Sequence, residues 1–156
     1  PLMCQQGFGH IVNTASVAGL MPLAGFLSYS ASKHAVVGLS TSLRVEAATL
    51  GVRVSVLCPG PVDTAIVGGG KFGKVLNPLP AEVLRRLWEQ GRPISVEVFA
   101  RTALAAVAKN KAIIVIPWWW KFFWWLYRLS PTLGMAWARR HFLAYQRVAK
   151  KCAAER

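Results

Sequence analysis

A tyrosine and a lysine four positions apart are the residues of this sequence whose types and spacing could move a proton. Tyr29 and Lys33 flank the tripeptide Ser-Ala-Ser. A phenol titrates near pH ~10 and keeps its proton at neutral pH, whereas a nearby ammonium group favours the phenolate. Residues at positions i and i+4 share one face of a helix. The pair is therefore a candidate proton-transfer device if a helix carries it.

The elements that would position this pair follow in the order strand, turn, helix, strand and loop. Residues 9–16 predict a short buried strand that ends in a polar turn at Ser16. A helix is predicted over residues 28–50, with Ser28 as its N-cap. Residues 52–58 predict a second strand, and they run into the loop Pro-Gly-Pro-Val-Asp-Thr. This order is typical of a parallel α/β sheet.

These segments resemble the short-chain dehydrogenase/reductase family, whose motifs N-T-A-S, Y-S-A-S-K and P-G-P-V-D-T occur here in the expected order. The resemblance extends over about residues 7–117. It implies that Ser16 orients the substrate oxygen, that Tyr29 is the acid/base, and that Lys33 favours ionisation of Tyr29. It also implies contacts with NAD or NADP from Tyr29, Lys33, Pro59, Gly60, Val62 and Thr64, with Lys33 on the nicotinamide ribose.

The fold implied by the resemblance is a Rossmann-type, doubly wound parallel sheet, of which these residues would form the C-terminal half only. Members of the family begin with a strand, a glycine-rich turn and a helix that cradle the pyrophosphate. The glycines Gly68, Gly70 and Gly73 have G-x-G-x-x-G spacing, but they follow a loop and lead toward Pro78. They predict no phosphate cradle, because that motif must follow a strand and open a helix. We expect the C-terminal part of a longer protein.

The rest of the chain divides into a lid, a helix and strand that complete the sheet, and a tail. Residues 60–93, rich in glycine and proline, predict a mobile substrate lid containing a short helix over residues 81–90. Ser95 is expected to cap a helix that extends to about Ala108. A buried strand is predicted over residues 112–116. The expected domain boundary follows residue 117, after which residues 118–156 form an aromatic and basic helical extension.

Charge and cysteine content limit the classes of partner and compartment. The net charge of +13 divides into +3 for residues 1–100 and +10 for residues 101–156. No nucleic-acid-binding motif accompanies these cations, so no nucleic acid partner is predicted. The chain has three cysteines and three histidines, none at metal-ligand spacing, and no metal site is predicted. The thiols predict an intracellular protein, cytoplasmic or peripheral to a membrane.

The tail can be interpreted in two ways. Five of the seven tryptophans lie within residues 118–127, and the apolar stretch from Ala112 to Tyr127 is shorter than the ~20 residues of a membrane-spanning helix. Ser130 and Pro131 begin a basic amphipathic helix. It could contact a membrane surface. Equally, its apolar side could pack on the protein and cover a lipophilic substrate pocket.

Taken together, the resemblance implies an NAD(P)-dependent oxidoreductase that transfers a hydride between nicotinamide and an alcohol or ketone. The aromatic tail suggests that this substrate is lipophilic. Two alternatives are an inactive fragment that lacks the dinucleotide-binding half, and a membrane-surface interaction protein. A homo-oligomer through the helix 28–50 is also expected, because small residues line one face of it and the family commonly pairs this helix. These small residues are Ala31, Ala35, Gly38 and Ser42.

Overall fold

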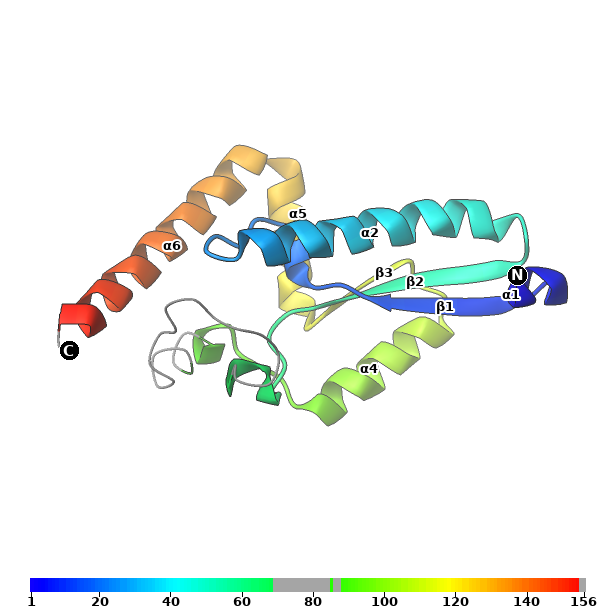
Figure 1. The fold of residues 1–156 in the computed structure, drawn as a ribbon, viewed down its shortest axis with the longest axis horizontal. Helices are drawn as coiled ribbons and strands as arrows, with labels where there is room; N and C mark the ends of the chain where they lie inside the picture. The colour runs from blue at the N-terminus through cyan, green and yellow to red at the C-terminus, as the bar shows by residue number, and fades with distance from the viewer. Residues whose placement is uncertain (69–84, 86–87, 155–156) are drawn as a thin grey trace.

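A three-stranded parallel sheet lies at the centre of the structure (Figure 1). The computed structural model describes residues 1–68, 85 and 88–154. The sheet contains β1 (Gly9–Thr14), β2 (Val52–Pro59) and β3 (Ile113–Ile116), in the order β1-β2-β3. Gly9 pairs with Val52, and Val56 pairs with Ile113. The predicted α/β class with a parallel sheet is confirmed.

Helices precede, separate and follow these strands. In chain order they are α1 (Leu2–Gln6), the 3-10 helix η1 (Val17–Gly19), α2 (Leu27–Ala48), the 3-10 helix η2 (Ala65–Gly68), α4 (Val96–Ala108), α5 (Trp118–Leu129) and α6 (Pro131–Ala154). The long helix α2 connects β1 to β2, and α4 leads into β3. Each parallel pair of strands is thus joined by a crossover that contains a helix.

The core lies on both faces of the sheet, because α2 covers one face and α4 covers the other (Figure 1). Beneath α2, Ala47 packs with Val52 and Val54. Beneath α4, Ala103 packs with Ile114 and Ile116. The central strand β2 is buried at most of its positions, among them the valines Val52, Val54 and Val56. The edge strand β1 is only half-buried, with a strand neighbour on one side.

Local sequence signals account for some helix boundaries. The hydroxyl of Ser95 accepts a hydrogen bond from the Val98 amide at 3.3 Å, so the predicted cap of α4 is confirmed. The predicted cap of α2 is wrong. That helix begins at Leu27, its N-cap is Phe26 without a side-chain cap, and Ser28 lies inside the first turn. The loop before α2 therefore sets the helix start two residues earlier than the serine signal indicates.

The helices α5 and α6 form a hairpin at the carboxyl end of β3, and α6 then extends away from the sheet (Figure 1). Phe123 of α5 stacks on Trp137 of α6, with ring centroids 5.0 Å apart. Gly134 of α6 lies so close to Tyr127 that a β-carbon there would come within 2.6 Å of its ring. Within the described ranges, no helix has the length and apolar character needed to cross a bilayer.

The expected lid falls mostly outside the described residues. Residues 69–84 and 86–87 are among those not described, and they include Gly70, Gly73 and most of the helix predicted over 81–90. Of that helix, residues 85 and 88–90 are described and are helical.

Candidate active site

Ser16 lies at the carboxyl end of β1, where the chain turns into η1. Its hydroxyl oxygen accepts a hydrogen bond from the Ala18 amide at 3.2 Å, and this bond makes Ser16 the N-cap of η1. The same hydroxyl donates to the carbonyl oxygen of Pro59 at 3.4 Å, a long and therefore weak bond. With 8% of its surface exposed, Ser16 is nearly buried. Its hydroxyl is held in place by the backbone, yet it could exchange Pro59 for a stronger acceptor.

Tyr29 and Lys33 lie in the first two turns of α2, as the spacing predicts. The Lys33 ammonium is 5.5 Å from the centroid of the Tyr29 ring. It also donates a hydrogen bond to the carbonyl oxygen of Thr14 at 3.3 Å. Thr14 is the last residue of β1 and precedes Ser16 by two positions. Lys33 therefore contacts Tyr29 on its own helix and the strand end that carries Ser16.

The close packing of η1 on α2 fixes this arrangement. A β-carbon at Gly19 would approach the carbonyl oxygen of Lys33 to 2.5 Å, so only glycine fits there without a backbone shift. A second link between β1 and α2 involves Asn13, the residue before Thr14. Its side-chain amide donates a hydrogen bond to the Ser40 hydroxyl at 3.0 Å. Strand β1, the turn after it and helix α2 are thus connected at several points around the candidate site.

The loop after β2 has its own fixed geometry. The Gly60 amide donates to the carbonyl oxygen of Ile116 at 2.8 Å, which extends the pairing of β2 with β3. Val62 forms an isolated parallel bridge with Ile94. Thr64 is exposed beyond that bridge. The described contacts join Pro59 to Ser16, but none of them brings Thr64 to the tyrosine or lysine.

Trp120 covers this loop from the α5 side. A β-carbon at Gly60 would come within 2.5 Å of the Trp120 indole ring, so the ring lies directly on the glycine. The indole nitrogen of Trp120 is buried without a hydrogen-bond partner among the described residues. The contact between loop and tail was not predicted from the sequence. Nothing local signals it, because the two residues are far apart in the chain.

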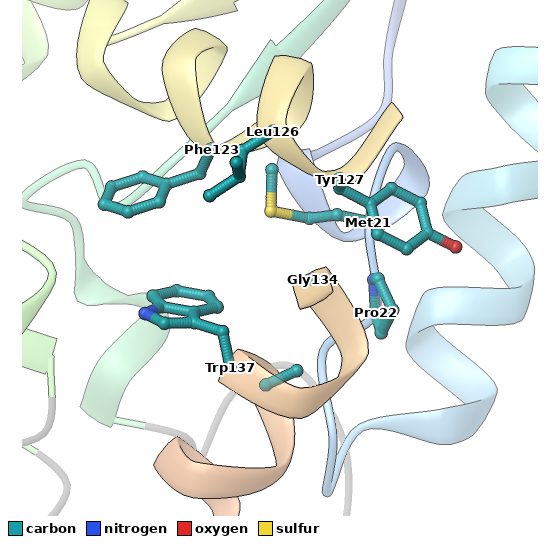
Figure 2. Close-up of a pocket in the computed structure, with 8 residues that line it drawn as sticks. Met21, Pro22, Phe123, Leu126, Tyr127, Gly134 and Trp137 are labelled. Atoms are coloured by element: carbon teal, nitrogen blue, oxygen red, sulfur yellow. The ribbon is translucent and has the colours of Figure 1, made fainter. Parts of the chain in front are cut away.

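An apolar pocket lies between α5, α6 and the segment after η1 (Figure 2). Met21 and Pro22 come from that segment, which follows Ser16 closely in the chain, and Trp137 faces them from α6. The volume of about 20 Å³ is near that of a single water site. The pocket is thus a gap in helix packing and too small for a substrate.

Burial changes the acid–base behaviour of a cysteine beneath the site. Cys58, the residue before Pro59, is fully buried beside Ala15 and Val56. This burial raises the pKa of its thiol to about 12, although a backbone hydrogen bond with Ser16 opposes the shift. The thiol therefore stays protonated at neutral pH. Cys58 supports the site as an apolar core residue.

Comparison with known proteins shows what this chain is similar to. The family model of the short chain dehydrogenases matches residues 1–70. The 1-deoxy-11-beta-hydroxypentalenate dehydrogenase of Streptomyces exfoliatus is 50% identical over 60 residues, which are 38% of this chain and 22% of that enzyme.

Two solved structures have a similar fold over most of the chain. A short chain dehydrogenase/reductase from Burkholderia phymatum, in complex with NAD, is 30% identical with a TM-score of 0.70, over 85% of this chain and 52% of that one. A short-chain dehydrogenase from Sphingobium yanoikuyae, in complex with NADPH, is 26% identical with a TM-score of 0.59, over 92% of this chain and 48% of that one. The chain thus spans about half the length of these two proteins.

Proposed function

The chain belongs to the short-chain dehydrogenase/reductase family, and on that premise we propose that the protein containing it is an NAD(P)-dependent oxidoreductase. Its reaction would transfer a hydride between nicotinamide and an alcohol or carbonyl carbon. The observation that carries this proposal is the position of Lys33, whose ammonium contacts both the Tyr29 ring and the end of the strand leading to Ser16. In open parallel sheets, ligands bind at the carboxyl ends of the strands, where this group lies.

The proposed roles follow from the chemistry of the three side chains. In the direction of reduction, the Tyr29 hydroxyl would give its proton to the substrate oxygen as negative charge develops there. The Ser16 hydroxyl would donate a hydrogen bond to the same oxygen, in place of its weak bond to Pro59. The positive charge of Lys33 would favour the tyrosinate that remains. When bound, the nicotinamide supplies or accepts the hydride.

The residues present fit the nicotinamide riboside part of the cofactor. An ammonium group has three N–H donors, and the bond to Thr14 uses one of them, so Lys33 can also bind ribose hydroxyls. Pro59, Gly60, Val62 and Thr64 would lie along the nicotinamide. In the described part of the chain, no glycine-rich turn joins a strand to a helix in the way that pyrophosphate binding requires. We therefore propose that these 156 residues alone bind NAD(H) and NADP(H) weakly and do not turn over.

The proposed substrate is a lipophilic alcohol or ketone. Supporting this class, the segment after Ser16 carries exposed apolar side chains at Leu23 and Phe26, beyond the buried Met21. The apolar part of a substrate held at Ser16 would pack against this segment. Residues 60–93 would close over it as a lid. Higher kcat/KM for small polar alcohols than for lipophilic ones would contradict this choice.

Two proposals concern the organisation of the whole protein. Residues 1–117 would be the C-terminal part of its Rossmann domain, and residues 118–156 an extension of that domain.

Small residues on α2, such as Ala35 and Gly38, are exposed, and a β-carbon at Gly38 would have no neighbour within 4 Å. This surface supports a homo-oligomer formed through α2. Sedimentation analysis of the protein, with and without Gly38→Trp, would test it.

The decisive experiment for the reaction is the substitution Tyr29→Phe in the protein that contains this chain. It removes one oxygen atom from an exposed side chain, so we expect unchanged folding and a loss of kcat/KM of about 100-fold or more. Tyr145→Phe is the matched control, because Tyr145 stacks on Phe142 in α6 and should leave turnover unchanged. Turnover close to that of the parent for Tyr29→Phe would refute the proposed role.

A further inference from the structure

Four large apolar side chains of α5 form a stripe that faces solvent. Trp118, Phe122, Trp125 and Leu129 are 76%, 62%, 51% and 79% exposed, respectively. Because they follow one another at intervals of three or four residues, they share one face of the helix. We call this surface the α5 stripe. Exposed apolar surface of this extent and regularity is typical of an interaction site.

The opposite face of α5 is already occupied, which keeps the stripe on the outside. Trp124 packs on the core cluster that includes Val56 and Cys58. Trp120 lies on Gly60, and Phe123 stacks on the ring of Trp137. Rolling the helix to bury the stripe would expose all three of these aromatic rings. The stripe therefore remains at the surface because burying it would break better contacts.

Cations lie beside the stripe on α5 and along the exposed part of α6. The guanidinium of Arg128 lies 5.8 Å from the Trp125 ring centroid and 5.4 Å from that of Trp124. Lys121 is exposed one residue before Phe122. On α6 the exposed cations are Arg139, Arg140, Arg147 and Lys150. Where the structure describes side chains, the single ion pair joins Arg85 to Glu89 and involves none of these residues. The described cations of α5 and α6 are thus available to an anionic partner.

We propose that the α5 stripe is a contact surface for a membrane that contains anionic lipids. Tryptophan and phenylalanine beside lysine and arginine favour the boundary between headgroups and acyl chains. Lipid phosphates would match the cations of α5 and α6. A second copy of the chain is a poorer partner, because a symmetric interface would place Arg128 and Lys121 near the same residues of the other copy. This inference does not depend on the proposed dehydrogenase activity.

The two faces of α5 would then connect the membrane with the candidate site. The stripe would contact lipid, while Trp120 on the other face covers Gly60 in the loop after β2. The thickness of one helix, about 10 Å, would separate the loop from the lipid. This last step alone rests on the proposed function: a lipophilic substrate dissolved in the membrane would have a short path to the site.

The experiment is co-sedimentation of the 156-residue chain with vesicles. We expect binding to vesicles of phosphatidylcholine with phosphatidylserine, weaker binding to phosphatidylcholine alone, and loss of binding as salt concentration rises. The double substitution Trp118→Ser and Trp125→Ser should weaken binding to the mixed vesicles by about tenfold or more. The matched control is Leu104→Ser, which changes a residue of α4 that is 70% exposed and lies outside the stripe.

Circular dichroism of each variant tests that it is folded. These substitutions remove exposed side chains, so helix content should match the parent. As a second measurement on the parent, the emission of its tryptophans should shift to shorter wavelength when mixed vesicles are added. Equal binding by the double variant and the parent would overturn the proposal. So would a failure to bind either vesicle, or a dimer in solution that the same two substitutions dissociate.

Discussion

Lys33 donates a hydrogen bond to the carbonyl oxygen of Thr14, with 3.3 Å between Nζ and O. The bond fixes a positive charge at the strand end that leads to Ser16. We predict that Lys33→Met in the protein containing this chain lowers kcat/KM by about 100-fold or more, while unfolding free energy changes by only about 0.5–1.5 kcal/mol. Lys33→Arg, which keeps the charge, should recover part of the activity. Equal activity of the methionine and arginine variants would contradict a role for the charge.

Gly19→Ala should destabilise the fold by about 1–3 kcal/mol. The added methyl group would meet the backbone carbonyl of Lys33 at 2.5 Å, and a backbone cannot move aside as a flexible side chain can. Because η1 follows Ser16 directly, activity should fall together with stability. Urea denaturation gives the free energy of unfolding. Parent-like stability would show that η1 is free to shift away from α2.

Gly38→Ala is the counterpart of Gly19→Ala at a helix position where an added methyl group meets no neighbouring atom. A β-carbon at Gly38 has no neighbour within 4 Å, and alanine favours helix over glycine. In the monomer, at protein concentrations too low for α2 to pair with a second copy, the variant should therefore gain about 0.5–1 kcal/mol of stability. A loss of stability, measured in the same denaturation series, would instead indicate that another chain covers this face of α2 in solution.

The stability of the fold should depend on pH through His10. Ser55 gives its hydroxyl hydrogen to the carbonyl of Lys111 at 2.7 Å, so His10 donates from Nε2 to Ser55 at 2.8 Å. Burial lowers the pKa of His10, and the positive charges of Arg53 and Arg44 add to this effect.

The unfolded chain therefore binds a proton at a higher pH than the folded chain does. The contribution of His10 to the stability of the fold is complete above its unfolded-state pKa of 6.5. It is lost as pH falls through the lower pKa of the folded state. Urea denaturation between about pH 8 and pH 5.5 would measure this loss. His10→Gln, which can still donate to Ser55, should flatten the profile. An unchanged slope in that variant would assign the pH dependence to another group.

Alkylation should distinguish Cys58 from Cys4 in the folded chain. Cys58 is buried and its pKa is raised to about 12, whereas Cys4 is exposed. Since the thiolate is the reactive form, iodoacetamide at neutral pH should modify Cys4 and leave Cys58 intact. Peptide mapping by mass spectrometry would identify the modified sites. In urea both should react, and rapid modification of Cys58 without urea would contradict the burial.

Strand and cap signals in the sequence predicted much of the fold, because those signals are local. The alternating valines of β2 and the serine before α4 each act within a few residues. The start of α2 shows the limit of such signals. Phe26 precedes that helix without a side-chain cap, so tertiary contacts of the loop outweigh the preference of Ser28 for the cap position. The roles of Ser16, Tyr29 and Lys33 came from the resemblance and stay predictions.

The orientation of α5 could not be predicted from its sequence. Nearly every residue from Trp118 to Tyr127 is apolar, so hydrophobic periodicity does not distinguish the buried face from the exposed one. Trp124 packs on the core and its neighbour Trp125 faces solvent, although the two side chains are identical. Contacts between distant parts of the chain, such as that of Trp120 with Gly60, hold the helix in this orientation.

The parallel sheet has a consequence for how the chain folds. The three strands that the structure describes pair in parallel and form no hairpin, so Gly9 must find Val52 and Val56 must find Ile113 across long intervening segments. Contacts of such high sequence separation pay the entropy of loop closure before they gain any stability, so we expect slow sheet formation. Helix α2, whose hydrogen bonds are local, can form first and shorten the distance that β1 and β2 must close. The contact between Lys33 and Thr14 would then appear late, when the strand end reaches a helix that already exists.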